Sequence, residues 1–166
     1  MIIVEGPDGS GKSIIGQRLT YLLKQPCYHE GGPTITRQDA MARLERQSDR
    51  FGSILDRVTF VSEKVYGPIL RGKLALDEKT LDWYEQRFIN AGWILIYCRP
   101  SDAAIIEYVR GGRMDKLIIE LGKSDYKKRD HVQGVKDNIE AIIASYDHVI
   151  ASLKKKGMMV MTYVRD

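Results

Sequence analysis

Residues 6–13 combine glycines, a lysine and a serine at the spacing of a phosphate-binding loop. Their sequence, Gly-Pro-Asp-Gly-Ser-Gly-Lys-Ser, matches the pattern G-x-x-x-x-G-K-[ST] at every fixed position. Glycines let successive backbone N–H groups point into one concavity, and the N-terminus of a following helix adds partial positive charge. We expect Lys12, facing solvent, to neutralise the β- and γ-phosphates of ATP, and Ser13 to ligate Mg²⁺. The predicted ATP-binding residues are Gly6, Asp8, Gly9, Ser10, Gly11, Lys12 and Ser13.

Two further polar groups belong to the same chemistry. Asp8 places a carboxylate inside a loop that collects phosphates, which is unfavourable unless the acid has a function. Asp56 and Arg57 follow the apolar run 53–55, where an arginine can grip a phosphate with two N–H groups and a carboxylate can hold a metal through water. Alternatively, Asp8 is an ordinary turn residue, and Asp56-Arg57 forms a surface salt bridge.

The elements that must position these residues follow from alternating patterns along the chain. Short apolar runs, which we interpret as strands, cover residues 2–4, 26–29, 53–55, 93–98 and 158–164. Helical spacing of apolar residues covers 12–24, 37–47, 58–70, 77–90, 101–109 and 132–155. Continuous rather than alternating apolar runs are typical of a parallel sheet covered on both faces. We therefore predict a three-layer α/β/α fold around a five-stranded parallel sheet, with ligands bound at the carboxyl ends of the strands.

The composition excludes several classes of protein. The 166 residues are 43% hydrophobic and 29% charged, which is ordinary for a globular domain and excludes disorder and collagen-like repeats. The net charge of +4 suits a protein that handles phosphates, but is too small to argue for duplex DNA binding by itself. Two cysteines make no disulfide framework, no apolar run approaches the ~18 residues of a membrane span, and the first apolar run is too short for a signal peptide. We expect one cytoplasmic domain over residues 1–166.

With these residues in view, the chain resembles the thymidylate kinases. Their phosphate loop reads G-x-D-G-x-G-K-[ST], as residues 6–13 do, and they carry an Asp-Arg pair where this chain has Asp56-Arg57. The resemblance implies that Asp8 accepts a hydrogen bond from the 3′-hydroxyl of the acceptor nucleotide. It also implies that Arg57 grips the acceptor phosphate and takes part in catalysis, while Asp56 assists Mg²⁺ binding or positions the acceptor.

The resemblance extends to the region expected to bind the acceptor, about residues 30–90. Ser62 and Tyr66 share one helix face, as in the helix that lines the acceptor base pocket of the family. Tyr66 is alternatively ordinary core, and Arg71 contacts the acceptor phosphate or solvates the helix end. Glu30 lies in a segment similar to the family's Arg-Glu-Pro-Gly-Gly-Thr, with His29 in place of the arginine. We expect Glu30 to position the acceptor or magnesium.

A mobile lid is expected at about residues 110–130. Nucleotide kinases close an arginine-bearing segment over the phosphates at this point, and Gly111 and Gly112 supply freedom for a hinge. Arg110 and Arg113 can spread the charge that develops on the transferring phosphoryl group, so both are predicted to be catalytic. The basic run at residues 123–129 is interpreted as a solvated helix end.

The residues and the resemblance together predict ATP-dependent, Mg²⁺-dependent phosphorylation of a deoxynucleoside monophosphate, dTMP or a modified-pyrimidine relative. Parts of the chain look more like thymidylate-kinase-like proteins of bacteriophages, which places it in the host cytoplasm if it is phage-encoded. Some of that group are proposed to phosphorylate 5-hydroxymethyluracil within DNA, and only this alternative gives the protein a DNA partner. Otherwise we expect its partners to be small-molecule nucleotides. We expect no association with a membrane, and a homodimer is left open.

Two other functions are disfavoured by particular residues. Residues 49–52 match the D-x-x-G element of regulatory GTP-binding proteins, but the Asn-Lys-x-Asp that reads guanine is missing from the sequence. A non-catalytic nucleotide-binding protein would not need Lys12, Ser13 and the arginines together. A kinase is therefore the preferred interpretation.

Overall fold

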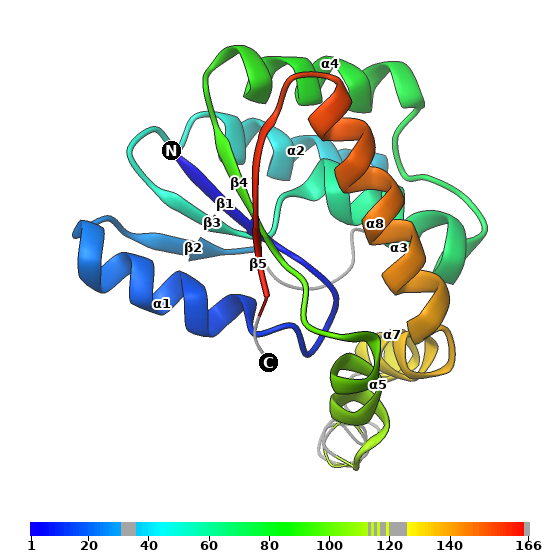
Figure 1. Ribbon diagram of the computed structural model, residues 1–166. Coiled ribbons are helices and arrows are strands. Elements are labelled where there is room, and N and C mark those ends of the chain that lie inside the picture. Colours follow the sequence, from blue (N-terminus) through cyan, green and yellow to red (C-terminus); the bar gives the residue numbers. More distant parts are fainter. Residues whose placement is uncertain (31–35, 113, 115, 117–118, 120–125, 165–166) are drawn as a thin grey trace.

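The computed structural model describes residues 1–30, 36–112, 114, 116, 119 and 126–164 (Figure 1). The strands are β1 (Ile2–Glu5), β2 (Cys27–His29), β3 (Ile54–Asp56), β4 (Ile94–Cys98) and β5 (Met159–Tyr163). The helices are α1 (Lys12–Leu23), α2 (Arg37–Ser48), α3 (Thr59–Arg71), α4 (Glu78–Asn90), α5 (Asp102–Arg110), α7 (Tyr126–Asp137) and α8 (Ile139–Lys155). Every predicted strand is present, and each lies within two residues of its expected bounds.

The five strands form one sheet in the order β2-β3-β1-β4-β5, and every neighbouring pair is parallel. This confirms the predicted sheet. The chain runs from β1 to β2 and β3 on one side, and then to β4 and β5 on the other. The order therefore reverses at β1, and the carboxyl end of the strand at such a switch point is where open α/β sheets bind ligands. The loop of residues 6–11 follows β1 directly.

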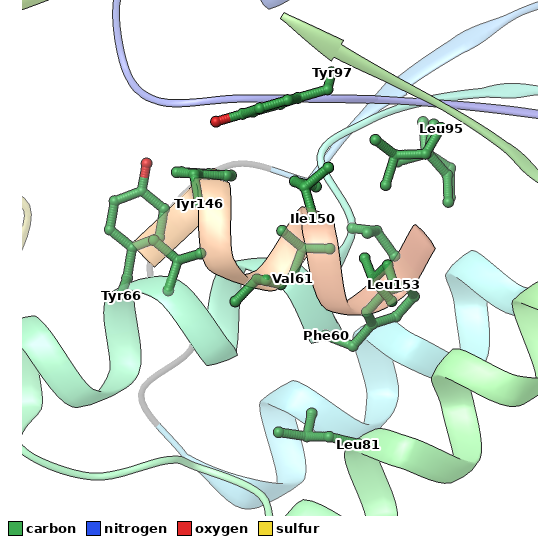
Figure 2. Close-up of a cluster of buried hydrophobic side chains, with 14 of the residues drawn as sticks. Phe60, Val61, Tyr66, Leu81, Leu95, Tyr97, Tyr146, Ile150 and Leu153 are labelled. Atoms are coloured by element: carbon green, nitrogen blue, oxygen red, sulfur yellow. The ribbon is translucent and has the colours of Figure 1, made fainter. Parts of the chain in front are cut away.

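Helices cover the two faces of the sheet unequally. Helix α1 packs against β1, β2 and β3 on one face, while α2, α3, α4 and α8 lie on the other (Figure 1). The larger core forms on that second face, where α3, α4 and α8 contribute apolar side chains beneath β4 (Figure 2). Phe60, Leu95 and Tyr146 are fully buried there. Burial of this apolar surface is the main favourable contribution to folding, and it fixes α3 beside the carboxyl ends of the strands.

Three helices begin at residues whose side chains accept a backbone hydrogen bond. Thr36 caps α2, Asp77 caps α4 and Ser101 caps α5, with each oxygen accepting the N–H three residues later. These caps satisfy donors that the first turn of a helix leaves free. The cap at Ser101 fixes where the chain leaves β4 and turns into the helix before the predicted lid.

The single helix predicted over residues 132–155 is wrong, because the chain breaks at Asn138 into α7 and α8. The side-chain amide of Asn138 donates to the Gly134 carbonyl at 2.9 Å, and its φ of −117° leaves the helical region. Asparagine competes with the helix through such local hydrogen bonds, and Gly134 weakens the turn before it. The break lets α7 approach the site while α8 stays against the sheet.

The expectation that all strands are covered on both faces is also incomplete. β1 and β3 are buried, but the edge strands β2 and β5 expose most of their residues. In β5, Met159 and Met161 are 62% and 58% exposed on the face that α1 covers only over β1, β2 and β3. Apolar composition alone does not separate an edge strand from a central one.

Candidate active site

The loop between β1 and α1 has a conformation that only glycine allows at two positions. A Cβ atom on Gly6 would clash with the carbonyl oxygen of Cys98, at the end of β4. At Gly9 the φ is +82°, and a Cβ atom would lie 2.5 Å from the ring of Tyr108 on α5. β4 and α5 therefore contact the loop at these two glycines, which holds its backbone in place.

Lys12 is 6% exposed, so the expectation that it faces solvent is wrong. Its Nζ turns inward and donates to the Pro7 carbonyl at 2.6 Å. Burial, followed by the charge of nearby Arg57, lowers the pKa of Lys12 to about 8, although the carboxylates of Asp8 and Glu5 oppose the shift. A buried ammonium group with one neutral partner gains strongly from a phosphate, because its charge is poorly screened there.

Ser13 and Asp56, the two residues predicted to hold a metal, lie in contact. The Ser13 hydroxyl donates to Asp56 Oδ2 at 3.1 Å, and His29 Nδ1 lies 3.1 Å from the same oxygen. The other oxygen, Oδ1, is buried and has no hydrogen-bond partner. Mg²⁺ is usually held by one or two carboxylates together with substrate phosphates, so a hydroxyl beside an unpaired carboxylate oxygen suits it. No group of three or more His, Cys, Asp or Glu side chains in the described ranges forms a cage for a metal by itself.

Asp8 is held between two groups on the other side of the loop. Arg57 Nη2 forms an ion pair with Asp8 Oδ1, and the Tyr66 hydroxyl donates to Oδ2 at 2.9 Å. Burial would raise the pKa of Asp8, but Arg57 and Lys12 outweigh it and hold that pKa well below its ordinary value. Asp8 is therefore an ionised acceptor in a fixed orientation rather than a solvent-exposed turn residue, and the pair with Arg57 is partly buried rather than superficial.

All the residues predicted to bind the acceptor except Asp8 lie around one pocket beside the phosphate loop. This pocket is lined by Glu30, Arg57, Ser62, Tyr66 and Arg71. They come from the ends of β2 and β3 and from α3, so the fold brings these five residues together. Each charged member has a partner. Arg71 donates to Glu63 at 2.7 Å, and Glu30 accepts from Arg46 at 3.1 Å.

Six more residues line this pocket and were missed by the sequence analysis. Arg43 and Gln47 belong to α2, His131 belongs to α7, and Val58, Thr59 and Glu63 lie at or near the start of α3. Gln47 is buried, and its Oε1 accepts the backbone N–H of Thr59 at 2.9 Å. Nothing in the polar pattern of residues 37–47 separates Gln47 from its exposed neighbours. The helix break at Asn138, which positions α7, was itself not predicted, so His131 gave no signal either.

The predicted lid is only partly within the described residues. Arg110 ends α5 and donates to Glu140 of α8 at 2.8 Å, on the surface and not at the phosphate loop. Arg113 and much of the span 110–130 lie outside the described residues.

The aromatic residues Phe51 and Trp83 are 66% and 57% exposed and do not line the pocket, while Tyr84 packs in the core.

Glu5, the last residue of β1, is a buried acid that the sequence analysis did not single out. Its Oε1 accepts the Val58 N–H at 2.6 Å, and its Oε2 accepts from the Gly6 N–H at 3.3 Å and the Tyr146 hydroxyl at 3.2 Å. Burial raises the pKa of Glu5 to about 7, although the Val58 N–H and the charges of Arg57 and Lys12 act in the opposite direction.

This pKa makes stability depend on pH in a specific window. The pKa rises from 4.5 to about 7 on folding, so between these values the folded chain binds more protons than the unfolded chain. We expect the free energy of unfolding to fall as pH increases through this window, by roughly 3 kcal/mol. Urea unfolding of the wild type and of Glu5→Gln at pH 4.5 to 7 measures it. The variant lacks this contribution, so its free energy of unfolding should not fall in this way. Plots of the free energy of unfolding against pH that stay parallel for the two proteins would contradict the prediction.

Comparison with known proteins shows similarity at the level of the fold. No model of a known protein family and no curated protein matches the chain. Among solved structures, YorR from Bacillus subtilis, in complex with phosphorylated GDP, has a TM-score of 0.73 and 20% identity over 98% of this chain and 84% of its own. Deoxyadenosine kinase from M. mycoides with bound dATP has a TM-score of 0.59 and 15% identity, and the match covers 98% of this chain and 90% of the kinase. No described helix is long and apolar enough to cross a membrane. The chain has the α/β fold of the P-loop kinases, with a five-stranded parallel sheet.

Proposed function

We propose that this protein transfers the γ-phosphoryl group of ATP to a deoxynucleoside monophosphate, dTMP or a modified-pyrimidine relative. The observation that carries the proposal is the pocket beside the phosphate loop, where Arg57 connects the two. Its guanidinium lines the pocket and pairs with Asp8 of the loop. Arg43 and Arg71 line the same pocket. Arginine is suited to a phosphate because its planar N–H groups bind two oxygens at once.

The chain's own residues supply positioning and charge for this reaction. Lys12 and the N-terminus of α1 hold the donor phosphates, while Arg57 holds the acceptor phosphate in line. Ser13 and Asp56 would hold Mg²⁺, which neutralises charge on the β- and γ-phosphates when bound. An acceptor phosphate oxygen is already ionised at neutral pH, so no side chain has to remove a proton. Arg110 and Arg113 are proposed to reach the transferring group when the lid closes.

A nucleoside acceptor would make a different demand on the site. A 5′-hydroxyl must lose a proton during transfer, so a nearby carboxylate would have to act as a base. Glu30 lies in the pocket, but its carboxylate accepts two hydrogen bonds from Arg46. Both of its oxygens are therefore engaged by Arg46 in an ion pair. The similar structures include a deoxyadenosine kinase with the products dCMP and dCDP bound, so both acceptor classes belong in the test.

The deciding experiment offers the purified protein γ-labelled ATP, Mg²⁺ and a panel of acceptors. The panel contains the deoxynucleoside monophosphates, the four deoxynucleosides, and duplex DNA with thymine or 5-hydroxymethyluracil. We expect label on a pyrimidine monophosphate, with the other classes at least tenfold slower. Preferential labelling of a nucleoside, or of DNA, would replace the proposal by that activity. Transfer to none of them would contradict it.

A further inference from the structure

Arg57 has a backbone conformation that side chains rarely adopt. Its φ is +78°, one of two positive values among the non-glycine residues that the structure describes. Such a conformation is energetically unfavourable for a residue with a Cβ atom, and it persists only when surrounding contacts impose it. In this case, it turns the chain between β3 and α3 so that the guanidinium reaches both Asp8 and the pocket.

Two hydrogen bonds hold the peptide groups on either side of this residue. The Arg57 N–H donates to the Val4 carbonyl at 3.0 Å, which continues the pairing of β3 with β1. The next N–H, that of Val58, donates to Glu5 Oε1 at 2.6 Å. The first bond is ordinary sheet pairing, and the second depends on one side chain. Glu5 is therefore the group that redirects the backbone immediately after Arg57.

Glu5 is itself fixed in position by burial and by a hydrogen bond from α8. It is completely buried, and the Tyr146 hydroxyl of α8 donates to its Oε2 at 3.2 Å. A carboxyl group in such a place is unfavourable unless it makes specific hydrogen bonds, and an apolar residue at the end of β1 would pack without that penalty. An apolar residue, however, could not accept a hydrogen bond from the Val58 N–H.

We propose that Glu5 is a positioning residue, whose hydrogen bond to the Val58 N–H imposes the left-handed backbone of Arg57 and so aims its guanidinium at the acceptor. The proposal rests on the proposed function, because it gives Arg57 an acceptor phosphate to bind. Glu5 itself touches no substrate and acts through Arg57 alone.

The test compares two replacements of Glu5. Glu5→Gln keeps an oxygen that accepts the Val58 N–H, whereas Glu5→Leu keeps the approximate size and removes the acceptor. We expect Glu5→Leu to raise the KM of the acceptor at least tenfold and to change the KM of ATP less than threefold. Glu5→Gln should restore the acceptor KM to within threefold of the wild type. An equal change in both KM values would mean a general disturbance of the loop and would overturn the proposal.

A double-mutant cycle with Arg57→Ala separates positioning from folding. If Glu5 acts through Arg57, then Glu5→Leu should change the acceptor KM less than threefold when Arg57 is already alanine. An undiminished effect in that background would overturn the proposal. If Glu5→Leu alone does not fold, Glu5→Leu with Tyr146→Phe replaces both hydrogen-bonding partners by apolar groups and takes its place.

Crystal structures of the two variants provide a readout that needs no activity. We expect Arg57 to keep a positive φ in Glu5→Gln and to lose it in Glu5→Leu, with the guanidinium moving away from Asp8. A positive φ in both would overturn the positioning role, whatever the kinetics. If the wild type phosphorylates no monophosphate, the proposed function fails, and the φ of Arg57 still decides the role of Glu5.

Discussion

Replacing Lys12 by alanine should lower kcat by on the order of 10²-fold or more, while the chain remains folded. The ammonium group is nearly fully buried in the loop, where its only described hydrogen bond goes to the Pro7 carbonyl. Buried charge is poorly screened, so it acts strongly on the negative charge that develops on the transferring phosphoryl group. Steady-state turnover of the acceptor identified in the panel measures the effect.

An exposed lysine on another face provides the matched control. Lys154 lies in the last turn of α8 and is exposed, so Lys154→Ala removes the same charge without touching the loop. It should turn over at the wild-type rate, and thermal unfolding should show both variants folded. A Lys12→Ala enzyme within threefold of wild-type kcat would contradict the assignment of the phosphate loop.

The second large effect concerns the 3′-hydroxyl of the acceptor. Arg57 and Tyr66 fix the ionised carboxylate of Asp8, whose oxygens can each accept a further hydrogen bond. A 2′,3′-dideoxy monophosphate lacks the donor, so the charged carboxylate would lose this hydrogen bond and keep only its bonds to Arg57 and Tyr66. We expect its kcat/KM to be roughly 10²-fold below that of the deoxy form, which corresponds to about 3 kcal/mol.

Asp8→Ala should narrow the difference in kcat/KM between the deoxy and dideoxy acceptors to a few-fold. This variant also frees Arg57, so absolute rates will fall for both acceptors. The ratio between the two acceptors within one variant cancels this common loss. Equal turnover of deoxy and dideoxy forms by the wild type would exclude a hydrogen bond between Asp8 and the 3′-hydroxyl.

We expect the same carboxylate to distinguish a free nucleotide from a nucleotide inside DNA. The 3′-oxygen of an internal nucleotide belongs to an anionic phosphodiester and carries no proton. Two unit charges ~4 Å apart repel by about 4 kcal/mol at an effective dielectric constant near 20. Asp8 therefore opposes the alternative of 5-hydroxymethyluracil phosphorylation within DNA, and efficient labelling of internal bases would show that it takes another position in the complex.

The sheet and the phosphate loop were predictable because their signals are local. Residues 6–13 specify a loop whose neighbouring strand and helix follow directly in the sequence. The position of the residues proposed to bind the acceptor was predictable for a different reason. Parallel strands bring their carboxyl ends to one edge, so residues that follow β2 and β3 had to lie near the loop after β1. Glu30 and Arg57 are such residues, and both line the pocket.

What the sequence did not reveal depends on contacts between distant segments. The burial of Lys12 follows from the way its side chain turns to Pro7. The bond from Val58 to Glu5 joins residues 53 positions apart, and no pattern along β1 distinguishes this acid from a solvent-exposed one. Gln47 likewise became recognisable only when the start of α3 was seen to donate to its side chain.

The open edge of the sheet affects how copies of the protein meet. β5 carries two largely exposed methionines, and a bare edge strand with apolar side chains is a template for strand pairing between molecules. Lys154 and Lys155 stand exposed in the last turn of α8, just before this strand, so a second copy that paired in parallel along this edge would bring like charges together. Such lysines act as gatekeepers against aggregation. Their protection weakens as salt rises, because ~0.15 M salt already screens charges beyond about 8 Å.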